Sequence, residues 1–151
     1  MNASSLPAGI SGIVVIGRNE GERLMACLAS LRGSGCPVVY VDSGSRDGSA
    51  ERARAQCEAV VELDPARPFS AARARNEGFA ALRAAQPQSA FVQFLDGDFT
   101  LLPGWLAASR QAISRSPSLR PITTMPATPA GRLDAFIGRA GQGGECAATR
   151  R

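Results

Sequence analysis

The aspartate pair in Asp96-Gly97-Asp98 is the part of this sequence that could most directly do chemistry. Residues i and i+2 of an extended chain point to the same side, so the two carboxylates are expected to project together. Such a pair is unfavourable unless a cation joins it, and a hard divalent ion suits oxygen ligands. The ion would leave room for phosphate oxygens and would stabilise a diphosphate leaving group. Without its context, however, the motif is more often a plain turn.

Two further polar residues stand where they could meet the same ligand. Asp42 follows an apolar run and could accept a hydrogen bond from a base N–H or a ribose hydroxyl, or could simply form an Asx-turn or helix cap. Arg75 falls on an expected helix, where it could pair with a diphosphate or a base, or could be an ordinary solvated residue. Arg73 is two positions away and faces elsewhere around the helix, so Arg75 is the preferred ligand.

The hydrophobic pattern predicts the scaffold that positions these residues. Short apolar runs rich in β-branched residues predict buried strands at 13–16, 38–41, 59–63 and 90–95. Helical spacing and capping residues predict helices from 19 or 20 to about 31, from about 49 to 57, from 71 to about 85 after a Ser70 cap, and from 103 to about 114. This alternation predicts an α/β fold with a doubly wound, mostly parallel sheet. Ligands bind beyond the carboxyl ends of such strands, so both acidic turns should open on one crevice.

Composition divides the 151 residues into three parts. Residues 1–10 form an N-terminal tail, 11–115 the α/β domain, and 116–151 an irregular tail rich in Pro and Arg. Residues 101–151 hold 7 of the 17 Arg and only two acidic residues, whereas 1–100 hold 10 Arg and 11 acidic residues. The positive charge therefore belongs to residues 101–151, and no nucleic-acid-binding face is expected on the domain.

Several classes of protein are disfavoured by what the sequence lacks. It has no His, which excludes Ser-His-Asp hydrolysis, and its four Cys form no CxxC pair for zinc. No GxGxxG follows the first strand, which disfavours a dinucleotide-binding oxidoreductase. The N-terminus does not resemble a signal peptide, and no apolar run is long enough to span a bilayer. We expect a cytoplasmic protein with reduced thiols, with a peripheral position at the inner face of the membrane as the variant.

Four segments, in order, resemble motifs of the family 2 glycosyltransferases. Residues 14–20 resemble the opening strand and donor loop, 40–49 the "VDDGSxDGT" turn, 74–79 the "ARNxG" helix, and 94–98 the "FLDxD" metal motif followed by Pro-Gly-Trp-Leu at 103–106. The resemblance covers about residues 11–106. It implies a GT-A fold, which is Rossmann-like.

The resemblance also implies an activity and a site. The activity is metal-dependent transfer of a sugar, with inversion, from a nucleoside diphosphate-sugar, most commonly a UDP-sugar, as in the synthesis of polysaccharides, glycolipids and glycoproteins. The nucleotide-sugar site would comprise Ile16, Arg18, Glu20, Asp42, Arg75 and Asp96. Asp42 would lie at the base and Arg75 near the base or phosphates. Asp96 would lie near the ribose or donor sugar, and Asp98, with Asp96, would hold Mg²⁺ or Mn²⁺.

The sequence departs from the family pattern in two places. Ser43 stands where a second Asp is usual, so the identity of the base is less certain. The family's second half supplies the acceptor site and a carboxylate general base, and here only Asp134 and Glu145 are weak candidates for that base. We therefore expect a truncated or frame-disrupted member. Its carbohydrate or lipid acceptor is unknown, and the alternative to an enzyme is a catalytically incompetent nucleotide-sugar-binding fragment.

Overall fold

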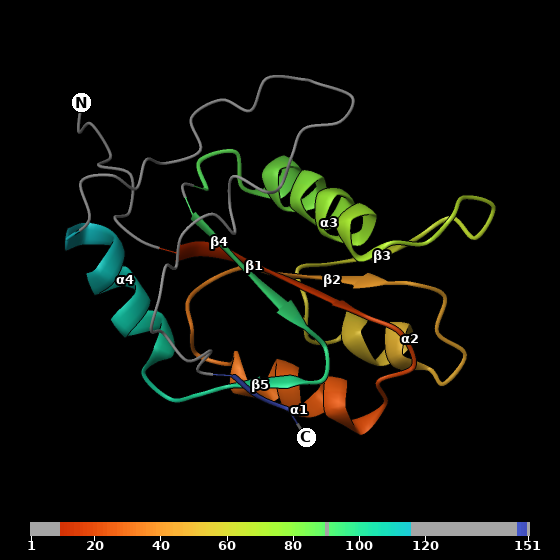
Figure 1. Cartoon of the computed structure of the whole chain (residues 1–151), viewed down its shortest axis with the longest axis horizontal. Coiled ribbons are helices and arrows are strands. Elements are labelled where there is room, and N and C mark those ends of the chain that lie inside the picture. The colour runs from red at the N-terminus through yellow and green to blue at the C-terminus, as the bar shows by residue number, and fades with distance from the viewer. Residues whose placement is uncertain (1–9, 90, 116–147, 151) are drawn as a thin grey trace.

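The computed structural model describes residues 10–89, 91–115 and 148–150 (Figure 1). In chain order the elements are β1 (Ile10–Gly17), α1 (Glu22–Ser30), β2 (Val38–Asp42), α2 (Ser49–Arg54), β3 (Ala59–Glu62), α3 (Ala71–Ala85), β4 (Phe91–Asp96), β5 (Phe99–Leu101), α4 (Trp105–Arg115) and β6 (Ala148–Arg150). The predicted alternation of strands and helices is confirmed through β4.

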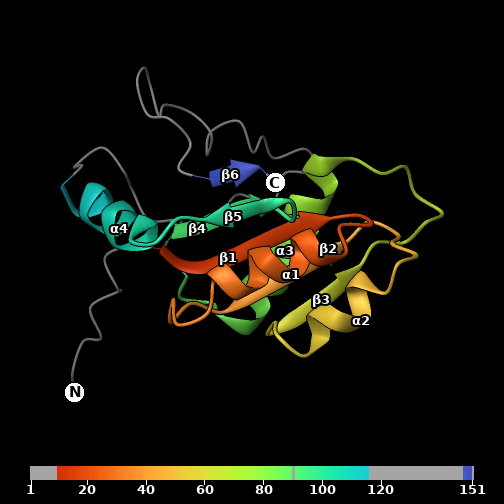
Figure 2. The same ribbon diagram turned by 90° about the horizontal axis from the view of Figure 1, so that it is seen from below.

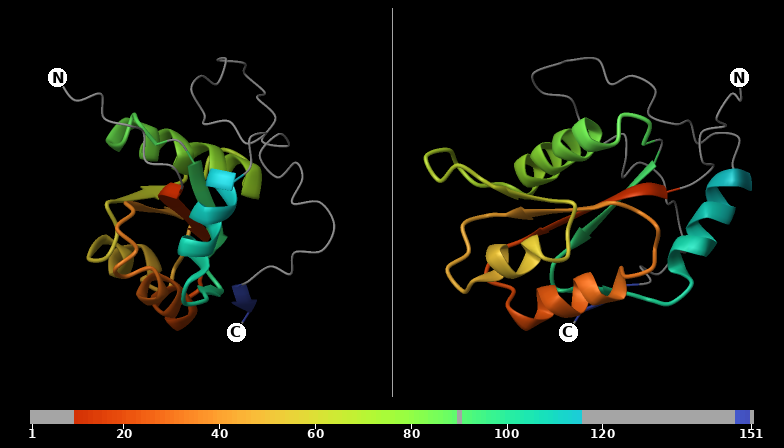
Figure 3. Two further views of the ribbon diagram at one scale, coloured as in Figure 1. Left: turned by 90° about the vertical axis from the view of Figure 1, so that its left-hand side faces the viewer. Right: turned by 180° about the vertical axis from the view of Figure 1, so that it is seen from behind.

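The main sheet contains β1 to β4, all parallel, in the order β3-β2-β1-β4. Helix α3 covers one face, and α1 and α2 cover the other (Figures 1 and 3). The chain thus winds outward from β1 through β2 to β3 and then crosses to β4 on the other side of β1. The expected α/β, Rossmann-like fold class is confirmed.

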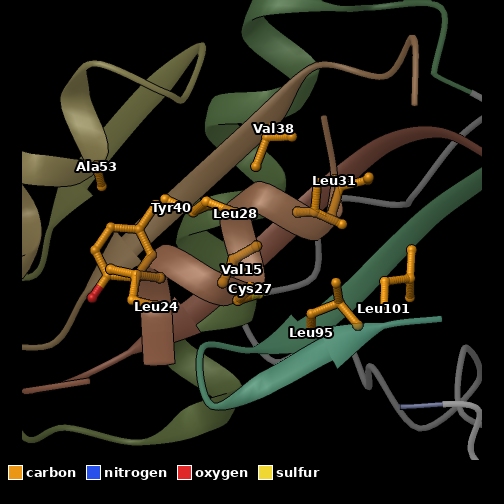
Figure 4. Close-up of a cluster of buried hydrophobic side chains, with 11 residues drawn as sticks. Val15, Leu24, Cys27, Leu28, Leu31, Val38, Tyr40, Ala53, Leu95 and Leu101 are labelled. Carbon is orange, nitrogen blue, oxygen red and sulfur yellow. The ribbon is translucent and has the colours of Figure 1, made fainter. Parts of the chain in front are cut away.

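Two hydrophobic clusters hold the helices on the sheet. On β1, Ile13 and Val15 pack with Leu24 and other residues on the α1 face, as Figure 4 shows for much of this cluster. Val14 and Ile16 point to the α3 face instead. Because successive residues of a strand face opposite sides, a strand covered on both faces is apolar at every position. This explains the unbroken apolar run that predicted β1.

Helix α3 is pressed unusually close to the sheet. A Cβ on Gly78 would lie 2.5 Å from Val14 Cγ1 and 2.6 Å from Val41 Cγ2, so only glycine fits there without movement of the sheet. The predicted cap is also confirmed, because the Ser70 side chain accepts a hydrogen bond from the Arg73 N–H at 3.1 Å. Close packing and capping therefore fix the backbone of the helix that carries Arg75.

The small sheet of β5 and β6 was not expected. The two strands are antiparallel, with Phe99 opposite Arg150 (Figure 2). Ala148–Arg150 lies in the segment predicted to be irregular, and residues 116–147 lie outside the described part of the chain. The second helix ends at Arg54, earlier than predicted, and α4 begins at Trp105 rather than at Pro103.

The thiols of the described core are reduced and chemically quiet. Cys27 is fully buried, and burial raises its pKa to about 12. Burial likewise raises the pKa of Cys57 to about 11. Thiolates are the reactive form, so these two side chains act as small hydrophobic residues at neutral pH.

Candidate functional site

The two acidic turns flank the carboxyl end of β1. In the strand register, Gly17 lies opposite Asp42 of β2, and Ile16 lies opposite Asp96 of β4. Two strand spacings put the backbones of the two aspartates roughly 10 Å apart. The end of β1 between them is the point where the strand order reverses, which is the usual ligand position in open α/β sheets.

The turn at residues 42–45, here the 42–45 turn, is held together by Asp42. Its carboxylate is 2% exposed, and Oδ1 accepts from the Tyr40 hydroxyl at 3.0 Å and from the Ser45 hydroxyl. Oδ2 accepts from the backbone N–H groups of Gly44 at 3.0 Å and Ser45 at 2.8 Å. A carboxylate offers about four acceptor positions, so donors from its own chain fill those of Asp42.

Burial, and then the charge of Asp42, raise the pKa of Tyr40 well above its usual range. Tyr40 therefore stays protonated and remains a hydrogen-bond donor to the carboxylate.

Ser43 is the polar residue of this turn whose hydroxyl makes no hydrogen bond to the described residues. Its backbone N–H donates to the Gly17 carbonyl at 3.0 Å, which ties the turn to the end of β1. Its Oγ is buried and has no hydrogen-bond partner among the described residues. A buried hydroxyl without a partner costs about 1–3 kcal/mol, so a partner supplied by a ligand would be favourable. The sequence marked Ser43 only as a departure from the family pattern.

The loop after β1 is tied to the 42–45 turn by contacts that the sequence did not reveal. The Asn19 N–H donates to Ser45 Oγ at 2.8 Å, and Asn19 Oδ1 accepts from the Arg46 N–H at 2.7 Å. Asn19 has φ 54°, a left-handed conformation that Asn tolerates better than most residues. These bonds join two loops into one rim beside the end of β1.

Three residues of the predicted nucleotide-sugar site lie at this rim or just below it. Ile16 is buried at the end of β1, and Arg18 is exposed in the loop that follows. Glu20 is mostly buried, with Oε2 2.9 Å from Arg23 Nη2, and its Cγ lies close to both Gly17 and Gly97. Glu20 therefore fills the space between the ends of β1 and β4.

The segment 96–98, here the 96–98 turn, is a bend and not an extended strand. Strand β4 ends at Asp96, and Gly97 and Asp98 turn the chain into β5. The expectation of an extended strand through Asp98 is therefore wrong, because the chain turns at Gly97 and Asp98. The Gly97 N–H donates to the Ile16 carbonyl at 2.7 Å, and a Cβ there would lie 3.3 Å from that oxygen. Glycine is needed for this close approach to β1.

The structure joins two of the predicted ligands directly. Arg75 Nη2 lies 3.0 Å from Asp96 Oδ1, and the two side chains are 25% and 49% exposed. Arg73, in contrast, is 12% exposed; its Nε donates to Glu77 at 2.7 Å, and its Nη1 donates to carbonyls of the loop before α3. Arg73 and Arg75 of α3 thus make different contacts, since Arg73 holds a loop and Arg75 reaches the 96–98 turn.

The residues of the 96–98 turn fit a divalent ion that a ligand helps to hold. No group of three or more His, Cys, Asp or Glu gathers within the described ranges, so a complete protein cage is absent from them. Mg²⁺ is commonly held by one or two carboxylates together with substrate phosphates and water. Asp96 and Asp98 supply that number of carboxylates. The two weak candidates for a general base, Asp134 and Glu145, lie outside the described residues.

Two cavities of about 370 and 580 Å³ lie beside the carboxyl end of α1, away from this edge of the sheet, and no predicted site residue lines either. Across the described ranges, no helix has both the length and the apolar character needed to cross a bilayer. The register of the strands and the chemistry of the side chains make the carboxyl edge of the sheet the candidate site.

Comparison with known proteins agrees with the motifs and the fold. The sequence model of the family described as Glycosyl transferase family 2 matches residues 12–119, which is more than half of the 151-residue chain. No match is found among curated proteins. The matched region contains every element from α1 to α4 and both acidic turns. The chain therefore belongs to glycosyl transferase family 2.

Proposed function

We propose that the chain binds a nucleoside diphosphate-sugar at the carboxyl edge of β1, β2 and β4 and transfers the sugar, with inversion, to an acceptor hydroxyl. The observation that carries the proposal is the register, which puts Asp42 and Asp96 on either side of the end of β1. Arg75 reaches the same edge from α3. Two carboxylates, the guanidinium of Arg75 and the reversal of strand order are thus found at the same edge of the sheet.

The base is proposed to lie against the 42–45 turn and the loop after β1. Asp42 keeps this turn in shape, since its acceptor positions are already filled. Ser43, whose buried hydroxyl has no partner in the described structure, is the residue proposed to meet the base once its side chain has rotated outward. Ile16, Arg18 and Glu20 would form the adjoining wall. A hydroxyl both donates and accepts, so uracil, the expected base, is compatible with it.

The diphosphate and the sugar are proposed to lie against the 96–98 turn. Asp98, with Asp96, would hold Mg²⁺ or Mn²⁺, and Arg75 would pair with a phosphate. When bound, the ion would neutralise the charge that develops on the departing diphosphate. Asp96 would also border the ribose or donor sugar. The proposal also includes a carbohydrate or lipid acceptor and a carboxylate general base, for which Asp134 and Glu145 are the weak candidates. The protein is proposed to be cytoplasmic, with or without peripheral membrane attachment.

Turnover of UDP-sugars tests the proposal. The chain is incubated with Mn²⁺, a panel of UDP-sugars, and simple sugar or lipid acceptors, and product and released UDP are measured. NMR of the product then reports whether the anomeric configuration is inverted. Metal-dependent transfer with inversion is the expected result.

The remaining outcomes separate the enzyme from its alternative. Metal-dependent UDP binding without transfer would indicate a donor-binding module that needs a further segment or partner for catalysis. Absence of both binding and transfer, for UDP-sugars and for other nucleoside diphosphate-sugars, would refute the proposal.

A further inference from the structure

We propose that Arg75 is an electrostatic latch: it occupies Asp96 while the site is empty and moves to the diphosphate when the donor binds. The inference rests on the proposed function and concerns how the same site is regulated. Its starting point is the 3.0 Å contact between Arg75 Nη2 and Asp96 Oδ1, two side chains both expected to bind the donor. In the structure, these two side chains bind each other.

The contact sets a divalent ion and the guanidinium in competition. A metal ion held by Asp96 would lie within a few ångström of the positive charge of Arg75, and like charges at that distance repel strongly. Salt screens this repulsion little, because the distance is much shorter than the Debye length of about 8–10 Å. Asp96 therefore serves the ion fully only after Arg75 has left it.

The part that moves is the arginine side chain and not its helix. Ala74 is fully buried, and Gly78 touches β1 and β2 so closely that α3 cannot slide. Arg73, one helical turn from Glu77, is held by that carboxylate and by loop carbonyls. Arg75, in contrast, has a flexible side chain, and its guanidinium contacts a single oxygen of the half-exposed carboxylate of Asp96.

A diphosphate supplies the better partner for a guanidinium. Its oxygens can accept two parallel hydrogen bonds from the planar fork, whereas the contact with Asp96 uses one nitrogen. When Arg75 moves to a phosphate, Asp96 is released to the ion, and the ion in turn binds the same phosphates. Metal and nucleoside diphosphate should therefore bind cooperatively, and each should strengthen the other by the same factor.

The test measures Mn²⁺ affinity of the whole chain without nucleotide, by titration calorimetry, in the wild type and in Arg75→Gln. Removing the latch should tighten Mn²⁺ binding about fivefold or more, a typical size for coupling between sites. Arg52→Gln is the matched control, because it removes the same charge from a surface pair with Glu22. Its Mn²⁺ affinity should match the wild type, and Arg75→Lys should stay closer to the wild type than Arg75→Gln.

The second measurement is UDP affinity at saturating Mn²⁺, where Arg75→Gln should bind more weakly than the wild type. Opposite signs for the two ligands are the signature of a latch. Mn²⁺ affinity that is unchanged or weaker in Arg75→Gln, with native circular dichroism, would overturn the inference and leave the proposed function standing. A wild type that binds UDP equally with and without Mn²⁺ would instead overturn the metal-dependent function and the latch with it.

Discussion

The 42–45 turn and the 96–98 turn lie at one edge of one sheet, yet their carboxylates are placed in opposite situations. Asp42 is 2% exposed and receives four hydrogen bonds from its own chain. Asp96 is 49% exposed and contacts the guanidinium of Arg75 on α3, a residue 21 positions earlier in the chain. The first carboxylate shapes the protein, and the second is available to be shared with a ligand.

Burial and the source of the hydrogen-bond donors distinguish a structural carboxylate at a sheet edge from one that could bind a ligand. A buried carboxylate must be compensated within the fold, since an unpaired buried charge is very costly. A half-exposed carboxylate with a side-chain partner can exchange that partner for a ligand at small cost, because exposed ion pairs contribute little to stability. Substitutions in the two turns should therefore affect different measured quantities.

The largest effect is expected from Asp98→Ala. Loss of a supporting residue alone costs metal sites about 10–100-fold in affinity, and loss of a direct ligand should reach the upper end. UDP affinity with Mn²⁺ should fall on the order of 100-fold, about 2.7 kcal/mol. Titration calorimetry measures the affinity, and a thermal melt should show an intact fold. A variant that binds as tightly as the wild type would remove Asp98 from the metal site.

Asp42→Asn should act mainly on stability. The amide keeps the shape of the carboxylate but turns an NH₂ group toward hydrogen-bond donors, leaving buried groups without acceptors. The free energy of unfolding should fall by about 2 kcal/mol, measured by urea denaturation. UDP affinity of the folded variant should change less than in Asp98→Ala. The reverse pattern, with stability kept and binding lost, would erase the contrast between the two turns.

Gly97→Ala should have an intermediate effect on stability. The added Cβ would lie 3.3 Å from the Ile16 carbonyl oxygen and 3.3 Å from Glu20 Cγ, so the turn must shift by a few tenths of an ångström. We expect a loss of about 1 kcal/mol in the free energy of unfolding, as for mild overpacking. An equally stable variant would show that the close approach to β1 is not needed.

The smallest effect on stability is expected from Asp96→Asn, the matched partner of Asp42→Asn. The pair with Arg75 is partly exposed, so its loss should change the free energy of unfolding by less than about 0.5 kcal/mol. The same urea titration measures it. A loss as large as that of Asp42→Asn would mean that the 96–98 turn is also structural.

Much of the fold could be predicted because its signals are local. The runs at Val14 and Val39 are apolar on both faces, and the Ser70 cap lies just before its helix. Strands β5 and β6 could not be predicted, because each has three residues and their pairing joins positions about 50 residues apart. A three-residue strand is too short to show a period.

The position of the candidate site could be predicted from the sequence, but not all of its side-chain contacts. Asp42 and Asp96 were expected at strand ends, and the register puts both there. The donors to Asp42 all lie within three residues of it, and the backbone donors form the Asx-turn that the sequence allowed. The contact of Asp96 with Arg75 could not be read from the sequence, because it joins positions 21 residues apart through tertiary geometry. The 96–98 turn also differs from the assumed extended strand, since β4 ends at Asp96 and the chain turns at Gly97 and Asp98.

The most direct test compares UDP with uridine in titration calorimetry, each with Mn²⁺ and with a chelator. If the 96–98 turn holds an ion that binds the diphosphate, Mn²⁺ should tighten UDP binding about tenfold or more, which is at least 1.4 kcal/mol, and leave uridine binding unchanged. Equal UDP affinity with Mn²⁺ and with the chelator would contradict a metal-mediated diphosphate site at the 96–98 turn.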